Sequence, residues 1–434
     1  MNDTSPISRG WVNEPDGRGT WGILTTCILT TILCCWTSVI PNLPAQCDGA
    51  FQRWRYKLDL AILTLLGSEF ILMLSAGQWT SARRSVKDFH EVGYMSWTMK
   101  HAFFADMGGF MVKPLEHDLP SFPLNSTQLF TLVKDGYLQY PNLEEEEIED
   151  RNKSDELTRW LAIAQALWFT LNCIFRFAQG LFVTTIELTT LSFIIAFLIT
   201  SYFWYHKPMG ITTPFILELH NSMATIRHDH QVTGLKWYQT PFDYLSRKEG
   251  FFIRAWRYYL RILRFFHISL LTWPQRRPYE RIPTITFPDW DVKAAIIAAP
   301  TITAFSVLFF VASNYDFPTA SEKILWRVAC VNAIVLPPVG RPLEYLQQTR
   351  PQADRGQKRE PTWIGRLASK IRNIDPEQDP HWEVSLRAFI PFTLLCAIYS
   401  VGRGFVLIED VIGLRSLPDS AFQTVSWSRY VPHL

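Results

Sequence analysis

Carboxyl groups inside apolar runs are the strongest chemical signal in this sequence. Glu69 lies near the middle of the apolar run 58–77. A carboxyl in such surroundings either pairs with a cation or stays protonated, because burial disfavours its charged form. A neutral acid in a dry, aromatic-lined pocket is suited to protonate an olefin. We therefore predict Glu69 as a catalytic acid, and a helix–helix hydrogen bond or ion pair is the structural alternative.

His101 and Asp106 form a second candidate pair in the moderately apolar stretch 94–112. An imidazole and a carboxyl can exchange protons during catalysis. Their spacing of five residues does not place them quite on one face of a helix. Both are candidate catalytic residues. In the alternative interpretation, Asp106 anchors the turn at Gly108–Gly109.

Arg176 and Glu187 each provide the only charge in one of two long apolar runs, 160–178 and 186–205. Gln179–Gly180 interrupts the apolar pattern between the two runs, so both charges lie near the same turn. Opposite charges on facing helices neutralise each other in apolar surroundings. We expect a structural ion pair here, with substrate binding by Arg176 and Glu187 as the functional alternative.

Metal and cofactor signals are weak. His228 and His230 would share a face on a strand, with His220 eight residues before His228, but this spacing is not specific for a metal site. Glu409 and Asp410 are adjacent and read as solvated carboxylates on a surface helix, 405–417, with Mg²⁺ binding as the alternative. The sequence contains no Walker loop, dinucleotide fingerprint, nucleophile elbow or aspartate-rich diphosphate motif. We expect no cofactor and no metal.

Long apolar runs must position these residues. A run of about 20 residues spans a hydrocarbon core of about 30 Å as a helix. A mean hydropathy of only +0.02 requires that such runs alternate with sizeable polar loops. The predicted fold is an all-α polytopic transmembrane bundle of about seven spans, with interfacial helices and extramembrane loops. The predicted spans are 21–40, 58–77, 160–178, 186–205, 292–313, 324–336 and 384–401.

The polar segments divide the chain around these spans. A polar tail, 1–20, precedes the first four spans (21–205), which enclose an extramembrane insert, 78–157. Residues 206–291 form the largest extramembrane segment. A basic loop, 341–383, lies within the region of spans five to seven (292–401), and an amphipathic tail, 402–434, closes the chain. The stretch 94–112 is too short to cross and is expected to form an interfacial or re-entrant helix.

A basic helix is predicted at 251–273, because its four arginines follow each other at spacings of 3, 4 and 3 and so share one face. These are Arg254, Arg257, Arg261 and Arg264. Such a helix is expected to lie on an anionic membrane surface. Basic residues also crowd the loops 78–157, 206–291 and 341–383. With seven spans, the positive-inside rule places these loops and the N-terminus in the cytosol, and the C-terminus on the other side.

Composition narrows the partners. A net charge of +2 gives no indication of a nucleic-acid partner. Aromatic residues make up 14% of the chain, enough for interfacial belts and an apolar cavity. Six of the seven cysteines lie in apolar runs, which indicates packing rather than a disulfide framework. The expected partners are the lipid bilayer and a lipophilic small molecule.

Several short motifs, taken in order, resemble one group of fungal polytopic membrane proteins. They are Arg18-Gly19-Thr20-Trp21, Trp97-Thr98, His101-Ala102-Phe103, Asp106-Met107-Gly108-Gly109-Phe110, Asp150 with Lys153-Ser154, Trp204, Lys207-Pro208, Gly402-Arg403, Leu414-Arg415-Ser416-Leu417-Pro418 and Trp427-Ser428-Arg429-Tyr430-Val431-Pro432-His433. The resemblance covers most of the chain. It implies an association with secondary-metabolite gene clusters, which include membrane-bound terpene cyclases, and it assigns no catalytic residue.

Three classes of function fit these observations. The favoured one is an integral membrane enzyme of fungal secondary metabolism, a terpenoid cyclase or isomerase that uses a buried acid on a lipophilic substrate. A transporter is less favoured, because polar residues within the spans are few and no inverted repeat is evident. A receptor or scaffold without chemistry is the third. The expected location is an endomembrane, such as the endoplasmic reticulum, or the plasma membrane.

Overall fold

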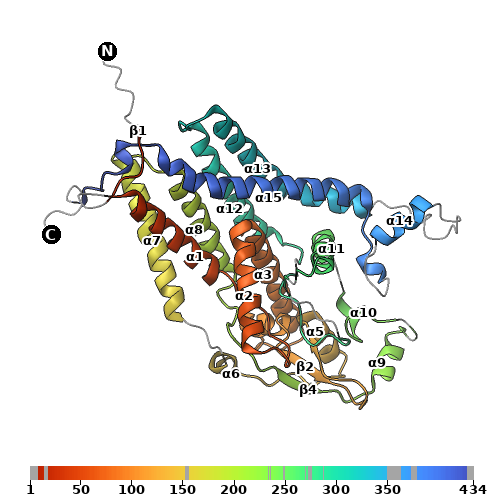
Figure 1. Ribbon diagram of the computed structural model, residues 1–434. Helices are drawn as coiled ribbons and strands as arrows, with labels where there is room; N and C mark the ends of the chain where they lie inside the picture. Colours follow the sequence, from red (N-terminus) through yellow and green to blue (C-terminus); the bar gives the residue numbers. More distant parts are fainter. Residues whose placement is uncertain are drawn as a thin grey trace.

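The computed structural model describes residues 8–13, 18–151, 156–232, 234, 236–247, 250–268, 270–271, 276–286, 288–348, 363–372 and 379–427. Two parts of the predicted basic loop (349–362 and 373–378) and the end of the closing motif (428–434) lie outside the described residues, as does Lys153-Ser154. The chain is mostly helical, as predicted (Figure 1).

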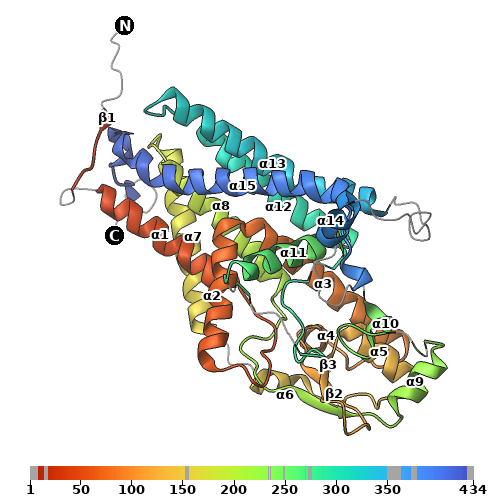
Figure 2. The ribbon, with the colours of Figure 1, turned by 45° about the vertical axis from the view of Figure 1, so that its right-hand side comes forward.

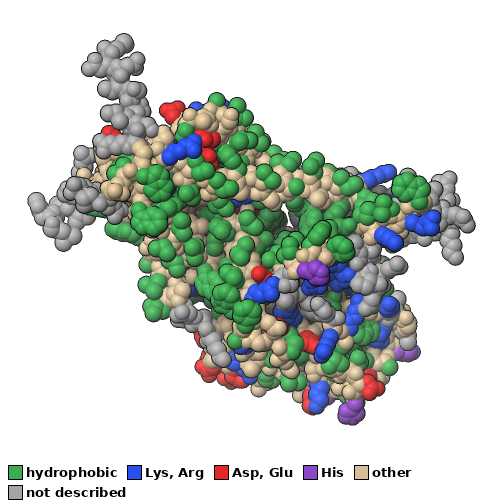
Figure 3. All heavy atoms as spheres, viewed as in Figure 1, with side chains coloured by type: hydrophobic (Ala, Val, Ile, Leu, Met, Phe, Trp, Pro, Cys, Tyr) green, Lys and Arg blue, Asp and Glu red, His purple; other side chains and the backbone are tan. Residues whose placement is uncertain are grey.

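Five helices are long and apolar enough to cross a membrane. They are α1 (Thr20–Thr37), α7 (Glu156–Ala178), α8 (Thr185–Phe203), α12 (Val292–Val311) and α15 (Leu386–Ile412). They coincide with five of the seven predicted spans. Large apolar side chains point outward from them, such as Phe177, which is 81% exposed, and Val401, which is 74% exposed. Figure 3 shows these hydrophobic side chains spread over the helical bundle.

The predicted span 58–77 is not one straight helix, and this expectation was wrong. It is divided between α2 (Ala50–Leu66) and α3 (Ser68–Glu91), which meet at an angle of 113°. Gly67 occupies the break, where a Cβ atom would lie 2.5 Å from the Phe70 ring. Only glycine fits so close an approach. Glu69 therefore lies in the first turn of α3, beside the bend, rather than in the middle of a span.

The last two long helices differ from the predicted boundaries. α13 (Ala320–Gln348) continues through Pro337 and Pro338, where the sequence predicted an end, and packs along α15. α15 continues beyond Val401 and includes most of the predicted surface helix. Because α15 still packs on α8 and α13, Glu409 and Asp410 are only 3% and 2% exposed. The prediction that these carboxylates are solvated was therefore wrong.

Parts of the predicted polar inserts 78–157 and 206–291 fold together into one compact subdomain, from which α11 is separate. Its sheet joins them: β2 (Phe110–Lys113) pairs with β3 (Phe122–Leu124) in antiparallel and with β4 (Phe215–Glu218) in parallel orientation. Around it lie α4 (Met99–Asp106), α5 (Ser126–Lys134), α6 (Glu145–Asp150), α9 (Met223–Asp229) and α10 (Asp243–Ser246). Figures 1 and 2 show this subdomain at one end of the helical bundle.

The subdomain has its own aromatic core, in which Phe89 stacks on Trp97 with ring centroids 4.2 Å apart. The helix α4 belongs to this core, and its residues His101 to Ala105 are buried. The expectation of an interfacial or re-entrant helix at 94–112 was therefore wrong. Apolar side chains of the two inserts cover α4, and the sequence order gives no sign of their pairing.

The two described chain ends lie side by side, at the end of the bundle opposite the subdomain (Figure 1). β1 (Ser8–Arg9) pairs with β5 (Leu417–Pro418), and the N–H of Arg18 donates to the carbonyl of Phe422. The prediction that the N-terminal and C-terminal ends lie on opposite sides of a membrane was therefore wrong.

The remaining elements of the described residues are α11 (Phe251–Phe265), α14 (Trp363–Arg372) and four short 3-10 turns. The turns are Ala312–Asn314, Pro380–Trp382, Gly413–Arg415 and Asp419–Ala421. α11 is the predicted basic helix, but it ends eight residues before Trp273. The next residues turn sharply, and His267 adopts a φ of 58°. All seven cysteines are free, in agreement with the sequence-based expectation.

Candidate functional site

A cavity of about 470 Å³ with both polar and apolar lining lies between α3, the subdomain and the segment 279–289. Its lining comes from the middle of α3, the end of α4, the start of α5, the start of α11 and Trp382. All of its lining residues lie outside the five apolar helices. A molecule in this cavity would therefore meet polar groups of the subdomain, and it would lie outside the apolar layer of the bundle.

Asp106, at the end of α4, is one of three aspartates that line this cavity, with Asp243 and Asp289. Its Oδ1 accepts a hydrogen bond of 3.0 Å from the Ser126 N–H, and its Oδ2 accepts one of 2.8 Å from Ser81 Oγ. Ser126 begins α5, so the carboxyl caps a helix N-terminus, which favours its charged form. Burial opposes this effect and is larger, so the pKa of Asp106 is raised above its usual value.

The two carboxyl oxygens of Asp106 have different hydrogen-bond partners, so they differ in whether they can carry a proton. The N–H of Ser126 can only donate, so Oδ1 must remain an acceptor. The hydroxyl of Ser81 can either donate or accept. A proton on Asp106 is therefore compatible with Oδ2, where Ser81 would turn to accept it. The site can hold Asp106 in either protonation state without losing a hydrogen bond.

Lys207 lies directly behind the cavity wall and is only 3% exposed. Its Nζ donates to Gln78 Oε1 at 2.9 Å and to the Ile40 carbonyl at 3.0 Å, and it lies 4.4 Å from the centre of the Trp204 ring. Burial lowers the pKa of Lys207 to about 7, although the nearby Asp106 charge acts to raise it. Gln78 lines the cavity and separates the Lys207 amine from it.

The cavity rim contains paired charges. Arg281 lies 3.1 Å from Asp48, and Arg247 bonds Asp379 at 2.5 Å. Arg257 of α11 lies 3.8 Å from the Trp382 ring and donates to the Tyr279 hydroxyl. This buried arginine belongs to the face that was expected to contact a membrane surface. In its case that expectation was wrong, because the cavity wall covers it.

The sequence reasoning found Asp106 but missed the residues that surround it. These are Asn42, Gln78, Ser81, Ser126 and Lys207. A lysine directly after an apolar run was the available signal, at Lys207-Pro208. Its partner Gln78 lies 129 residues away, directly after another apolar run, so the pair could not be recognised before folding.

His101 and Asp106 do not form the predicted pair. One ring nitrogen of His101 lies 2.8 Å from the Leu143 carbonyl, and the other lies 2.9 Å from Thr98 Oγ1. Burial lowers the pKa of His101, which favours its neutral form. Both of its nitrogens are thus occupied in the subdomain core, and neither contacts Asp106.

Glu69 is buried, at 2% exposure, and the Tyr399 hydroxyl of α15 donates to its Oε1. This contact fastens the bend between α2 and α3 to α15. Glu69 lines neither the cavity at Asp106 nor the groove between α3 and the end of α8. The contact matches the structural alternative, and catalysis by Glu69 stays a prediction.

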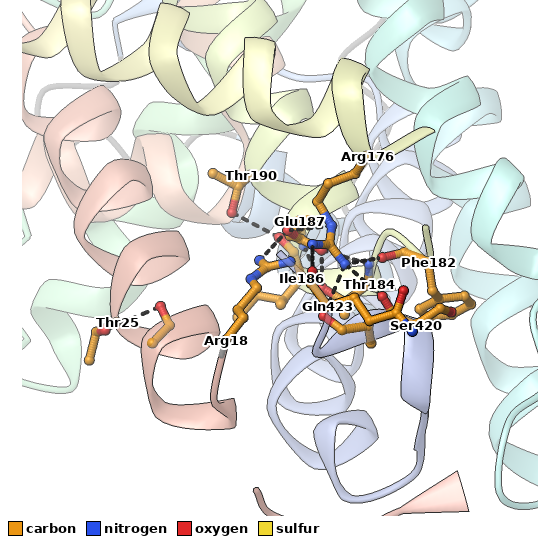
Figure 4. A network of polar contacts seen from close by, with 12 residues as sticks. Arg18, Thr25, Arg176, Phe182, Thr184, Ile186, Glu187, Thr190, Ser420 and Gln423 are labelled. Atoms are coloured by element: carbon orange, nitrogen blue, oxygen red, sulfur yellow. Dashed lines mark hydrogen bonds and ion pairs between the residues drawn. The ribbon is translucent and has the colours of Figure 1, made fainter. Parts of the chain in front are cut away.

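Arg176 and Glu187 come together as predicted, with Arg176 Nε 4.0 Å from Glu187 Oε1 (Figure 4). Arg18, which the sequence reasoning did not connect to them, also bonds Glu187. The Arg176 guanidinium donates to four backbone carbonyls, those of Phe182, Ser420, Ala421 and Gln423. These bonds fasten the C-terminal segment to the turn between α7 and α8. Substrate binding by Arg176 and Glu187 stays a prediction.

The other sequence candidates do not assemble a metal site. Residues 223–229 form the helix α9, and not the strand that His228 and His230 would need. His228 lies 3.6 Å from Asp229, and His230 lies 3.4 Å from Asp135. Across the described ranges, no group of three or more His, Cys, Asp or Glu side chains is arranged to hold a metal ion.

Comparison with known proteins identifies a family but no activity. Residues 2–228, more than half of the chain, match the family model described as "Family of unknown function (DUF8562)". No curated protein matches the chain, and no solved structure does. The matched range includes Asp106, its hydrogen-bond partners Ser81 and Ser126, and the pair Gln78 and Lys207.

Proposed function

We propose that this chain, which belongs to the DUF8562 family of unknown function, is an integral membrane enzyme. In this proposal Asp106 transfers protons to and from the substrate. The substrate is an amphiphilic small molecule whose polar part enters the cavity beside this carboxyl. One observation carries the proposal: the Asp106 carboxyl lines a cavity of about 470 Å³, and burial raises the pKa of this carboxyl. Perturbed acids in cavities are common at catalytic sites.

The membrane assignment rests on the outward apolar faces of the five long helices. Monomeric soluble proteins rarely expose contiguous apolar surface of this extent, which is typical of a membrane-facing surface. The adjacent chain ends require an even number of crossings. We propose six: the five apolar helices and α13. In this arrangement α2 and α3 form a re-entrant hairpin that enters and leaves on the subdomain side.

Two ion pairs support this arrangement. Glu322, near the start of α13, bonds Arg415, close to the C-terminal strand, at 2.5 Å. Asp379, which precedes α15, bonds Arg247 of the subdomain. α13 thus starts beside the chain ends, and α15 starts beside the subdomain. The basic loops then share the subdomain side, which the positive-inside rule assigns to the cytosol of an endomembrane or the plasma membrane.

The proposed chemistry is a cyclisation or isomerisation that needs no co-reactant. Asp106 donates its Oδ2 proton to an unsaturated carbon or its oxygen substituent, so an O–H bond breaks as a bond to hydrogen forms. The substrate cation then loses a different proton to the carboxylate, which regenerates the acid. Such acid–base catalysis contributes about 10²–10⁴-fold in rate. Ser81 holds Oδ2 in both states.

A receptor that binds the same molecule without changing it is the second candidate. Both oxygens of Asp106 have protein partners, which favours a structural role for the carboxyl within a binding site. A transporter is less favoured, because transporter sites lie near the bilayer midplane between spans. This cavity is built from residues outside the five apolar helices.

The test compares strains of the source organism that lack the gene or carry Asp106→Asn, by profiling lipophilic extracts. Loss of one product and accumulation of its precursor in both strains is the expected result. Asp118→Asn, an exposed carboxyl outside the cavity, is the matched control and should leave the profile unchanged. Full product formation by Asp106→Asn, with normal amounts of protein in the membrane fraction, would sink the catalytic assignment.

A further inference from the structure

We infer that a groove between α3 and the end of α8 binds the phosphate headgroup of an anionic phospholipid. The groove has a volume of about 800 Å³ and is separate from the cavity at Asp106. The inference rests on the proposed membrane insertion and is independent of the catalytic assignment of Asp106.

One face of α3 supplies the cationic wall of the groove. Trp79, Arg83, Lys87 and His90 line it at helical spacings of 4, 4 and 3, which place them on one face. Arg83 lies 4.6 Å from the centre of the Trp79 ring, and this stacking orients its guanidinium. Planar guanidinium groups match the geometry of phosphate oxygens.

Arg83 and Lys87 each have an acidic partner but keep N–H donors that a ligand can use. Asp291 lies 2.8 Å from one terminal nitrogen of Arg83 and occupies part of a guanidinium that has five N–H donors. Lys87 lies 3.5 Å from Glu91, and both side chains are mostly exposed, at 74% and 63%. Such exposed pairs contribute only about 0–1 kcal/mol. A phosphate can therefore recruit Lys87 at little cost.

The opposite wall places the groove at the level of a membrane surface. Tyr202, Tyr205 and His206 line it where the apolar helix α8 ends at Phe203. Trp290 lies just before the start of α12, the next apolar helix. Tyrosine and tryptophan gather at membrane–water interfaces, where one part of the ring is apolar and the other wet. This ring of aromatic side chains indicates that the groove opens at headgroup depth.

The composition of the groove favours a lipid over a free phosphate ion. Val86, Met95 and Met99 add apolar surface beside the cationic wall, and Met95 is 70% exposed. A phosphate ion would gain nothing from these side chains, whereas the glycerol and upper acyl chain of a lipid bury them. The subdomain side also carries the basic loops, and the cytosolic leaflet carries the anionic lipids.

The experiment measures thermal unfolding of the full-length protein in nanodiscs of phosphatidylcholine, with and without added phosphatidic acid. Phosphatidic acid should raise the unfolding midpoint of the wild type. This rise should fall by at least half in Arg83→Gln/Lys87→Gln. Lys87→Gln alone, which keeps the Arg83–Asp291 pair, should show a smaller loss and guards against misfolding of the double variant.

Arg366→Gln/Lys370→Gln is the matched control, since these exposed residues of α14 have the same spacing and remove the same charge. An equal loss in this control would mean non-specific attraction and would overturn the site. Equal stabilisation by inorganic phosphate in solution would overturn the assignment to a lipid. Release of the protein from membranes by alkaline carbonate would instead refute membrane insertion, whatever the product profile of the Asp106 variant.

Discussion

Nζ of Lys207, four residues after the end of α8, lies 2.9 Å from Oε1 of Gln78 in the middle of α3. The same amide oxygen accepts from the Trp204 indole at 3.1 Å, and its NH₂ group donates to the Thr284 carbonyl. One side chain thus connects the helical bundle, the segment 279–289 and the cavity. A buried network of this kind rigidifies its surroundings when every member is satisfied.

The buried amine of Lys207 makes stability depend on pH. Its pKa is about 7 in the folded protein, against an ordinary value of 10.5, so the unfolded chain binds more protons between these values. The free energy of unfolding should therefore rise as the pH increases through this window, by an amount on the order of a few kcal/mol. Thermal unfolding in detergent measures it. Lys207→Met should flatten the rise, and an unchanged slope in this variant would contradict the assignment.

Substitutions at Glu69 separate a structural from a catalytic acid. Glu69→Gln keeps an oxygen that accepts from the Tyr399 hydroxyl, so the unfolding midpoint should change little. Tyr399→Phe leaves the buried Glu69 without this donor and should destabilise by about 1–3 kcal/mol. Product formation is measured in both variants. If Glu69→Gln is stable yet inactive, Glu69 is the catalytic acid after all, and Asp106 loses its proposed role.

Removal of Arg176 should detach the C-terminal segment. Arg176→Met leaves four carbonyls without their donor and weakens the charge balance at Glu187, so we expect destabilisation of roughly 3–5 kcal/mol. Limited proteolysis should cut residues 417–427 faster in this variant. Lys113→Met, which breaks the exposed pair with Glu218, is the control and should cost less than about 1 kcal/mol.

Gly77 allows the segment 279–289 to approach α3 closely. A Cβ atom at Gly77 would lie 2.6 Å from the Pro288 carbonyl oxygen, so Gly77→Ala must push this cavity wall away. Overpacking of this kind costs about 1–3 kcal/mol and should also weaken ligand binding. Gly404→Ala in α15 meets no atom within 4 Å and should be neutral or slightly stabilising. Equal unfolding midpoints for the two variants would argue against the close contact.

The sequence by itself determined the long apolar helices. A helix forms its backbone hydrogen bonds within one segment, so run length and hydropathy predict it locally. The five runs that became α1, α7, α8, α12 and α15 are the clearest examples. The pair Arg176–Glu187 was also predictable, because both residues flank one short turn.

Only the tertiary structure decided how the polar segments combine. The pairing of β2 with β4 joins two inserts that the apolar hairpin of α7 and α8 separates in sequence. The bend at Gly67 and the pairing of β1 with β5 changed the expected topology. The bend lies within an apolar run that hydropathy reads as one helix, and the strand pairing joins backbones that are far apart in the sequence. The cavity at Asp106 depends on the same long-range contacts. Periodicity and composition report only what lies within one run, whereas a site built from several segments exists only once they pack.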